Sequence, residues 1–490
     1  MILRNGQPRR ARSGLTGAAL AAALTLGVSL TLTACGSSTG STTGSTQSDA
    51  TQSDSAATDS TAGSPSLPIF DATTSAPQST ADTVPPSTES AVPAPPTDRT
   101  IRVPADASTI QAAVDQAKPG DLVLVAAGTY KEAVHVRTPS VVVRGIDRNT
   151  VIIDGGDQLE NGILVSANNV AIENLTIRHF VVNGLLFTKA YDDNPDSQEH
   201  AVLRGYRASY VTASNNGLYG IYAFFAQGGV IEHSYASGHP DSGIYVGQCK
   251  PCDAIVRDNV AELNAVGYEG TNASGNLFVI NSVWRRNRIG LTPNSQNAEK
   301  LAPQGDIVVA GNVVEDNQDP AAPSAAQGGS GFGIAVGGGQ RNRVLRNLVR
   351  RNDSGGIVVT DLAKYQPESN EIRENLLEEN GIDLALYSSD GAASIPSRRN
   401  CFAGNTFVTS LPAMIETAAP CPPDSGPGVA DTPVAAGPFP LKAPAPNVDY
   451  RTVPLPPAQP GMPDASSTLR LPAVATVPVV DLNAITVPKP

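Results

Sequence analysis

Tyrosines gather in one part of the sequence, where aromatic rings could bind a ligand. Eight of the 12 tyrosines fall within the 78 residues from 191 to 268, together with Phe224 and Phe225. Sugar rings stack on the faces of such side chains. We select Tyr219, Tyr222 and Tyr245 as candidate ligand-binding residues. Tyrosines at strand spacing also pack over a core, so a binding face and a packing role both stay open.

A short stretch with two histidines could do acid–base or metal chemistry. His233, His239 and Asp241 lie together in the segment HSYASGHPD. Imidazole titrates near neutral pH and ligates metals. We therefore add His239 and Asp241 to the candidate ligand-binding residues. A structural or exposed pair of histidines in one turn is the alternative. No other acids are spaced as a recognisable general acid and base.

The densest acidic cluster is a candidate metal site. Asp192, Asp193 and Asp196 fall within five residues, and carboxylate oxygens are the ligands that Ca²⁺ prefers. The spacing of a dedicated calcium loop is absent, so a solvated polar loop is the alternative. No cofactor is expected, with Ca²⁺ at these acids as the alternative.

Arginine pairs could bind acidic sugars or form ion pairs with neighbouring segments. Arg285-Arg286, Glu315-Asp316, Arg350-Arg351 and Glu378-Glu379 recur at corresponding places, and their sign alternates. Opposite charges on adjacent strands stabilise a sheet by about 0.2–1 kcal/mol per pair. The alternation favours a charge ladder over a groove for polyuronates.

These charged pairs lie inside a repeat that must position them. Two asparagines enclose four residues in Asn259-VAEL-Asn264, Asn312-VVED-Asn317, Asn347-LVRR-Asn352 and Asn375-LLEE-Asn380, and Asn281-SVWRR-Asn287 has one residue more. Asparagine tolerates left-handed backbone, and its amide can bond to the same amide one coil away. Short aliphatic runs bounded by glycine read as strands. The repeat predicts a solenoid with coils of about 22 residues plus insertions.

The frame of paired asparagines followed by glycine and aliphatic strands resembles the right-handed parallel β-helix superfamily of pectin-lyase-like proteins, over residues 99–421. The segment TIQAAVDQAKPGDLVLVAAGTYKEAVHV is similar to the capping helix and first coil of that superfamily. The resemblance implies an all-β, single-stranded right-handed parallel β-helix with a short N-terminal capping helix. Lyases and epimerases of the superfamily use acids, Ca²⁺ and a basic residue, but neither their site nor that of the hydrolases can be placed on this sequence.

The first 36 residues resemble a bacterial lipoprotein signal. Four arginines and no acids precede an apolar stretch that ends in Leu32-Thr33-Ala34-Cys35. The resemblance implies removal of residues 1–34 and acylation of Cys35. The lipid bilayer is then a partner, and the protein is placed at the extracytoplasmic face of the cell membrane. A transmembrane anchor is the alternative.

The remaining four cysteines are an even number in an oxidising compartment. The simplest pairing joins Cys249 to Cys252 and Cys401 to Cys421. A redox motif or half of a zinc site is the alternative for the pair at 249 and 252.

Composition separates the solenoid from two flanking segments. Residues 35–98 are rich in Ser, Thr and Pro with no Lys or Arg, which predicts a disordered tether. Residues 422–490 contain 17 prolines, which predicts an extended or disordered tail. The formal charge of −12 argues against nucleic acid as a partner.

The sequence leaves three functions open. We expect a monomeric, lipid-anchored β-helix that binds cell-surface or environmental polysaccharide without need of catalysis. The alternatives are a polysaccharide lyase or C5-epimerase acting on uronate polymers, and a maturation or structural factor of the periplasmic type.

Overall fold

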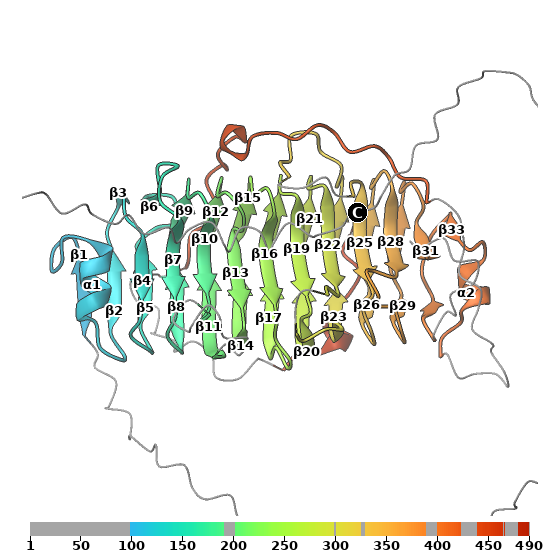
Figure 1. Ribbon diagram of the computed structural model, residues 1–490, viewed down its shortest axis with the longest axis horizontal. Coiled ribbons are helices and arrows are strands. Elements are labelled where there is room, and N and C mark those ends of the chain that lie inside the picture. The colour runs from blue at the N-terminus through green and yellow to red at the C-terminus, as the bar shows by residue number, and fades with distance from the viewer. Residues whose placement is uncertain are drawn as a thin grey trace, which may run out of the picture. The chain divides into compact units, whose positions relative to one another are not determined.

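The computed structural model describes residues 99–190, 201–297, 300–324, 329–388, 399–422, 439–463, 465 and 479–489. Its strands form three parallel sheets, and each complete coil between the first and the last adds one strand to each sheet in turn. Figure 1 shows these strands side by side, coil after coil, from β1 to β33. The expected all-β parallel solenoid is therefore confirmed.

The three sheets, named A, B and C, have the following members among the described residues. Sheet A contains β1 (Thr100–Val103), β2 (Leu122–Val125), β5 (Val142–Gly145), β8 (Val170–Glu173), β11 (Leu203–Ser209), β14 (Ala226–Glu232), β17 (Ala254–Arg257), β20 (Ser274–Ile280), β23 (Gly305–Ala310), β26 (Arg343–Leu345), β29 (Glu371–Arg373) and β32 (Cys401–Ala403). Sheet B contains β3 (Gly128–Tyr130), β6 (Val151–Asp154), β9 (Thr176–Arg178), β12 (Thr212–Ser214), β15 (Tyr235–Ser237), β18 (Val260–Glu262), β21 (Val283–Arg285), β24 (Val313–Glu315), β27 (Leu348–Arg350) and β30 (Leu376–Glu378). Sheet C contains β4 (Val134–Val136), β7 (Asn161–Val165), β10 (Asn183–Phe187), β13 (Ile221–Phe224), β16 (Ser242–Gly247), β19 (Val266–Thr271), β22 (Ile289–Asn294), β25 (Phe332–Gly337), β28 (Gly355–Thr360), β31 (Leu384–Tyr387) and β33 (Ser410–Leu411).

The core is a set of aliphatic stacks that run from coil to coil. In sheet C, Ile163, Leu185, Ile221 and Ile244 are partners in register on successive strands, and all four are fully buried. Each such side chain contributes roughly 1.5–3 kcal/mol through loss of apolar surface from water. Because each residue packs on its equivalent in the next coil, the repeat itself builds the core.

The expected capping helix is α1 (Ile110–Gln116), which lies against the first coil (Figure 1). The side chain of Thr109 accepts a hydrogen bond from the Ala112 amide at 3.0 Å and so caps the helix. Ile110 and Val114 are buried on its inner face. At the other end lies α2 (Ile415–Ala418), and two 3-10 turns occur at η1 (Tyr450–Thr452) and η2 (Leu482–Ala484).

The paired asparagines form two amide ladders at the corners on either side of sheet B. In each ladder the side-chain amide donates to the side-chain oxygen of the next coil, as in Asn312 to Asn347 at 3.0 Å and Asn317 to Asn352 at 3.0 Å. The side-chain oxygen also accepts a backbone N–H from the preceding coil. The predicted stacking of amides is confirmed, and it satisfies polar groups that are buried inside the solenoid.

The sequence interpretation placed Asn281 in the frame of paired asparagines, and this assignment was wrong. The ladder position after Asn259 belongs to Ser282, whose hydroxyl accepts from the backbone N–H of Asn259 at 3.1 Å. Asn281 is exposed and takes a left-handed backbone conformation beside it. The frame therefore keeps its usual spacing as Ser282 to Asn287, because a hydroxyl can accept the same backbone hydrogen bond as an amide oxygen.

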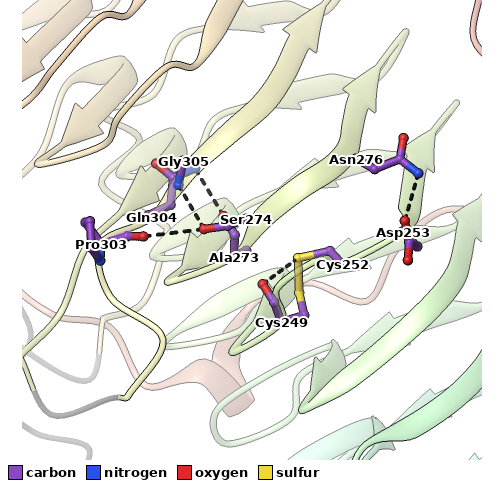
Figure 2. The surroundings of a disulfide bond; sticks show 9 residues. All are labelled: Cys249, Cys252, Asp253, Ala273, Ser274, Asn276, Pro303, Gln304 and Gly305. Atoms are coloured by element: carbon purple, nitrogen blue, oxygen red, sulfur yellow. Dashed lines mark hydrogen bonds between the residues drawn. A yellow bond between two sulfur atoms is a disulfide. The ribbon is translucent and has the colours of Figure 1, made fainter. Parts of the chain in front are cut away.

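Both expected disulfides are present, Cys249–Cys252 and Cys401–Cys421. Figure 2 shows the first, which closes the turn between β16 and β17. The next coil packs beside it, where the Ser274 hydroxyl accepts from the Gly305 amide at 3.0 Å. The pair at 249 and 252 is thus a structural crosslink of one coil corner in this structure.

The charge ladder is confirmed on the outer face of sheet B. Residues 285, 315, 350 and 378 are successive partners in register, with alternating sign. Arg350 bonds to Glu315 at 2.8 Å, and Arg285 bonds to Glu262 at 2.8 Å. These arginines are therefore already paired with carboxylates of neighbouring coils.

Candidate functional site

The outer face of sheet C brings three of the selected tyrosines together. Tyr222 and Tyr245 are register partners on β13 and β16, and their rings lie 4.8 Å apart edge to face. Tyr219, just before β13, packs against both, with ring centroids at 4.4 Å and 5.2 Å. Because side chains alternate along a strand, the partners of an outward residue also point outward.

These rings are mostly covered. Tyr219, Tyr222 and Tyr245 are 4%, 8% and 4% exposed, whereas the adjoining Phe224 is half-buried and packs on Tyr222 at 5.4 Å. The three tyrosines thus form a packed aromatic cluster. The more accessible groups at its border are Phe224 on one side and polar side chains on the other.

That polar edge is a pair of carboxyl groups. Glu269 on β19 is the register partner of Tyr245, and Asp241 directly precedes β16. The Ser242 hydroxyl lies 3.1 Å from Oδ1 of Asp241 and 2.8 Å from Oε2 of Glu269, so it joins the two. Asp241 and Glu269 are each half-buried as residues. We call Tyr219, Tyr222, Tyr245, Asp241 and Glu269 the aromatic–acid patch.

Neighbouring groups fix the second carboxylate. The Asn294 amide donates to Oε1 of Glu269 at 3.1 Å, and the Thr271 hydroxyl lies 2.9 Å from the same oxygen. Two hydrogen bonds to one carboxyl oxygen fix the orientation of the group. Glu269 is therefore the anchored member of the pair.

Asp241 has a strongly perturbed acidity. Burial among the surrounding groups raises the pKa of its carboxyl to about 7, and the charge of Glu269 acts in the same direction. Burial, with the charge of Asp241, also raises the pKa of the Tyr219 hydroxyl. Two carboxyl groups close together do not both ionise readily. The Asp241 carboxyl can therefore exchange a proton near neutral pH.

The patch includes Glu269, which the sequence interpretation missed. The usable signal was its distance of 24 residues from Tyr245, close to one coil, in a stretch where Tyr222 and Tyr245 are 23 apart. Another acid of the coils, Glu173, lies outside the patch and pairs with Arg144 at 2.7 Å.

His239 does not belong to this patch, and its assignment as a ligand-binding residue is not supported. Its side chain is fully buried in the amide ladder, where Nδ1 lies 2.7 Å from Oδ1 of Asn264 and Nε2 lies 3.1 Å from Nδ2 of Asn216. Ser234 and His239 have the same spacing as the asparagines of the frame. Burial lowers the pKa of His239 to about 4, so the ring is neutral at pH 7. His233 lies apart and stacks on Tyr210 at 4.8 Å.

We expect His239→Asn to make the protein less sensitive to acid. As the pH falls from about 6.5 to 4, the unfolded chain takes up a proton at this histidine before the folded chain does, which removes up to about 3 kcal/mol of stability. Asp241 titrates with the opposite sign, but both proteins retain it. Urea unfolding at pH 7 and pH 4.5 should show a smaller loss for the variant. Equal losses in both proteins would contradict a buried neutral histidine.

The remaining candidates lie elsewhere. Cys35 and the proposed calcium ligands Asp192, Asp193 and Asp196 are outside the described residues. Within the described part of the chain, no group of three or more His, Cys, Asp or Glu residues could hold a metal ion. No helix among the described residues is long and apolar enough to cross a membrane.

Comparison with known proteins matches the coil architecture. A family model for the right-handed β-helix region matches residues 200–372. No curated protein sequence matches the chain. Among solved structures, the A-module of the Azotobacter vinelandii mannuronan C-5 epimerase AlgE4 is 14% identical with a TM-score of 0.42, over 61% of this chain and 90% of that one.

Two further solved structures are similar at the same level. The pectate lyase Pel9A is 15% identical with a TM-score of 0.39, over 64% of this chain and 78% of that one. An alginate lyase from Paenibacillus sp. str. FPU-7 is 16% identical with a TM-score of 0.36, over 58% and 99%. With its three parallel sheets and the matching family model, the folded body of this chain is a right-handed parallel β-helix.

Proposed function

We propose that this protein is an exported lipoprotein whose β-helix binds polysaccharide at the aromatic–acid patch. The observation that carries the proposal is the meeting of three tyrosines with the pair Asp241 and Glu269 on the outer face of sheet C. Sugar-binding sites combine apolar aromatic surface with a few fixed polar groups. The carboxyl and phenol groups of this patch would accept hydrogen bonds from sugar hydroxyl groups and donate hydrogen bonds to them.

The location rests on the sequence. The basic, apolar and Cys35-terminated start of the chain would attach the mature protein to a bilayer by an acyl group. The Ser- and Thr-rich residues up to 98 would serve as a tether between this anchor and the β-helix. A lipid-anchored binder would thus meet polysaccharides of the cell surface or its surroundings.

A second candidate is acid–base catalysis on a uronate polymer by a lyase or epimerase. The observation in its favour is Asp241, whose pKa of about 7 suits a group that transfers a proton near neutral pH. The Tyr219 hydroxyl is adjacent and could take part in the same transfer. A maturation or structural factor is the third candidate, which would act on neither sugar nor polymer.

Binding to a panel of neutral, amino and uronate polysaccharides tests the leading proposal. We expect Asp241→Asn to weaken binding of the recognised glycan at least tenfold, since hydrogen bonds to charged groups contribute about 1.5–3 kcal/mol. Tyr222→Ala should weaken binding to a similar extent, because it removes the ring against which Tyr219 and Tyr245 pack. Calorimetry on the purified protein measures this change.

Matched variants serve as controls. Asp306→Asn removes an exposed carboxylate that pairs with Arg341, and Tyr365→Ala removes a tyrosine far along the chain from the patch. Both should bind as the wild type does. Unsaturated product absorbance or a changed epimer ratio, lost in Asp241→Asn, would instead favour the enzyme. Absence of affinity for every polysaccharide would exclude the leading proposal.

A further inference from the structure

The proline-rich C-terminal segment packs along the coils in the direction opposite to their order. We call residues 439–463 and 465 the strap. It begins at Phe439 beside β28 and β31, and its later residues contact coils nearer the start of the solenoid. In Figure 1 its first part is the red stretch along the edge of the strands.

Two buried arginines hold the strap through its main-chain carbonyls. Arg288, only 6% exposed, donates from Nη1 to the Ala445 carbonyl at 2.8 Å and from Nη2 to the Pro446 carbonyl at 2.9 Å. Arg148, 2% exposed, donates to the Pro460 carbonyl at 3.1 Å. Neither forms an ion pair among the described residues. Part of the hydrogen bonding that compensates these buried charges therefore comes from the strap.

Side-chain amides of the coils also bond to the strap. Nδ2 of Asn215 donates to the carbonyls of Tyr450 at 2.9 Å and Val453 at 2.8 Å. Oδ1 of Asn174 accepts from the Met462 amide at 3.0 Å. Arg288, Asn215, Asn174 and Arg148 thus form a row of side chains from four different coils that lines the path of the strap. We call these four side chains the track.

The chemistry of this row fits an extended proline-rich chain. Proline has no N–H, and an extended proline-rich chain makes no internal hydrogen bonds, so its free polar groups are mostly carbonyl acceptors. Both arginines and Asn215 supply donors to these acceptors, while Asn174 accepts from one of the few N–H groups of the strap. The track therefore binds the strap through hydrogen bonds to its main-chain groups.

Apolar side chains anchor the strap at its beginning. Phe439 is 7% exposed and packs on Val358 and Ala385 of the outer face of sheet C. Its ring lies 5.3 Å from that of Tyr387. Residues 479–489 make a comparable contact on sheet A, where Ile485 packs on Ile280 and Leu345.

We propose that the strap is an intramolecular peptide ligand that docks in this track and couples the unfolding of coils from β31 back to β5. In a solenoid each coil otherwise contacts only its neighbours, so coils can open from an end one after another. A segment bound at once to Tyr387, Arg288, Asn215 and Arg148 must be released before distant coils separate. The strap thereby makes these coils one cooperative unit.

The full-length protein can test this after cleavage of one peptide bond. A specific protease site is inserted between Pro422 and Phe439, and the folded protein is cut there, which leaves both pieces present and the sequence of the track unchanged. We expect the strap to stay bound to the cut wild type through gel filtration. Arg288→Ala and Phe439→Ala should each raise the dissociation constant of the cut strap at least tenfold.

Hydrogen exchange gives the second readout. On release of the strap, amide exchange in β22 to β31 should quicken at least tenfold, whereas before release these strands and β13 should exchange at a common slow rate. Arg341→Ala, at an exposed ion pair, and Leu455→Ala, at an exposed strap side chain, are the controls and should behave as wild type. Loss of the strap from the cut wild type without faster exchange would overturn the proposal, as would binding that Arg288→Ala and Phe439→Ala leave unchanged.

Discussion

Replacing Asn317 by alanine is expected to lower the free energy of unfolding by roughly 3 kcal/mol or more. Asn317 is fully buried, and its oxygen accepts from the backbone amide and side chain of Asn287, both at 3.1 Å. Its amide donates to the Trp284 carbonyl at 3.0 Å. Each buried polar group left without a partner costs about 1–3 kcal/mol. Urea unfolding followed by circular dichroism measures the change.

The control is another asparagine outside the ladders. Asn483 is exposed in η2, and Asn483→Ala should change the free energy of unfolding by no more than about 0.5 kcal/mol. A small and equal effect of both substitutions would mean that the stacked amides contribute little to the stability of the coils.

The second large effect is expected where a tyrosine ring occupies the space above a glycine. Tyr206 of β11 is fully buried, and its register partner on β14 is Gly229. A β-carbon at position 229 would lie 1.8 Å from Cζ of Tyr206. Gly229→Val should therefore force the ring out of the core and destabilise the protein by about 4 kcal/mol, the scale of losing a large core side chain.

A second substitution should rescue the first. Tyr206→Val alone leaves a cavity, but together with Gly229→Val it restores an aliphatic stack with Val170 on β8. It also removes a tyrosine hydroxyl that has no hydrogen-bond partner among the described residues. We expect a coupling energy of at least about 2 kcal/mol in a double-mutant cycle. Additive losses would contradict the packing of this ring over the glycine.

The fold was predictable because each coil repeats the same corner and strand residues at nearly the same spacing along the chain. Each ladder asparagine, such as Asn317, lies at a corner of its coil. The spacing of these asparagines along the chain therefore predicts where the corners are. Ser282 and His239 were not recognised as ladder members, because the motif was defined by asparagine alone. In the structure a hydroxyl and an imidazole replace the amide at these two positions. The position, rather than the residue type, is what the corner requires.

The candidate site was predictable only in part. Tyr219, Tyr222 and Tyr245 attracted notice as a cluster in the sequence, and register on sheet C brings them together. Glu269 could not be ranked above other acids without that register, because one residue of slip would turn its side chain to the other face. Contacts of the strap, such as Arg288 with Ala445, join residues 157 apart and follow no repeat.

Carboxyl labelling with a carbodiimide, read by mass spectrometry, most directly tests the claim that the aromatic–acid patch binds polysaccharide. The recognised glycan should slow the labelling of Asp241 and Glu269 several-fold while Asp306 and Glu371, on other parts of the surface, keep their rates. Binding of the glycan with unchanged labelling of Asp241 and Glu269 would contradict the account and place the binding surface elsewhere.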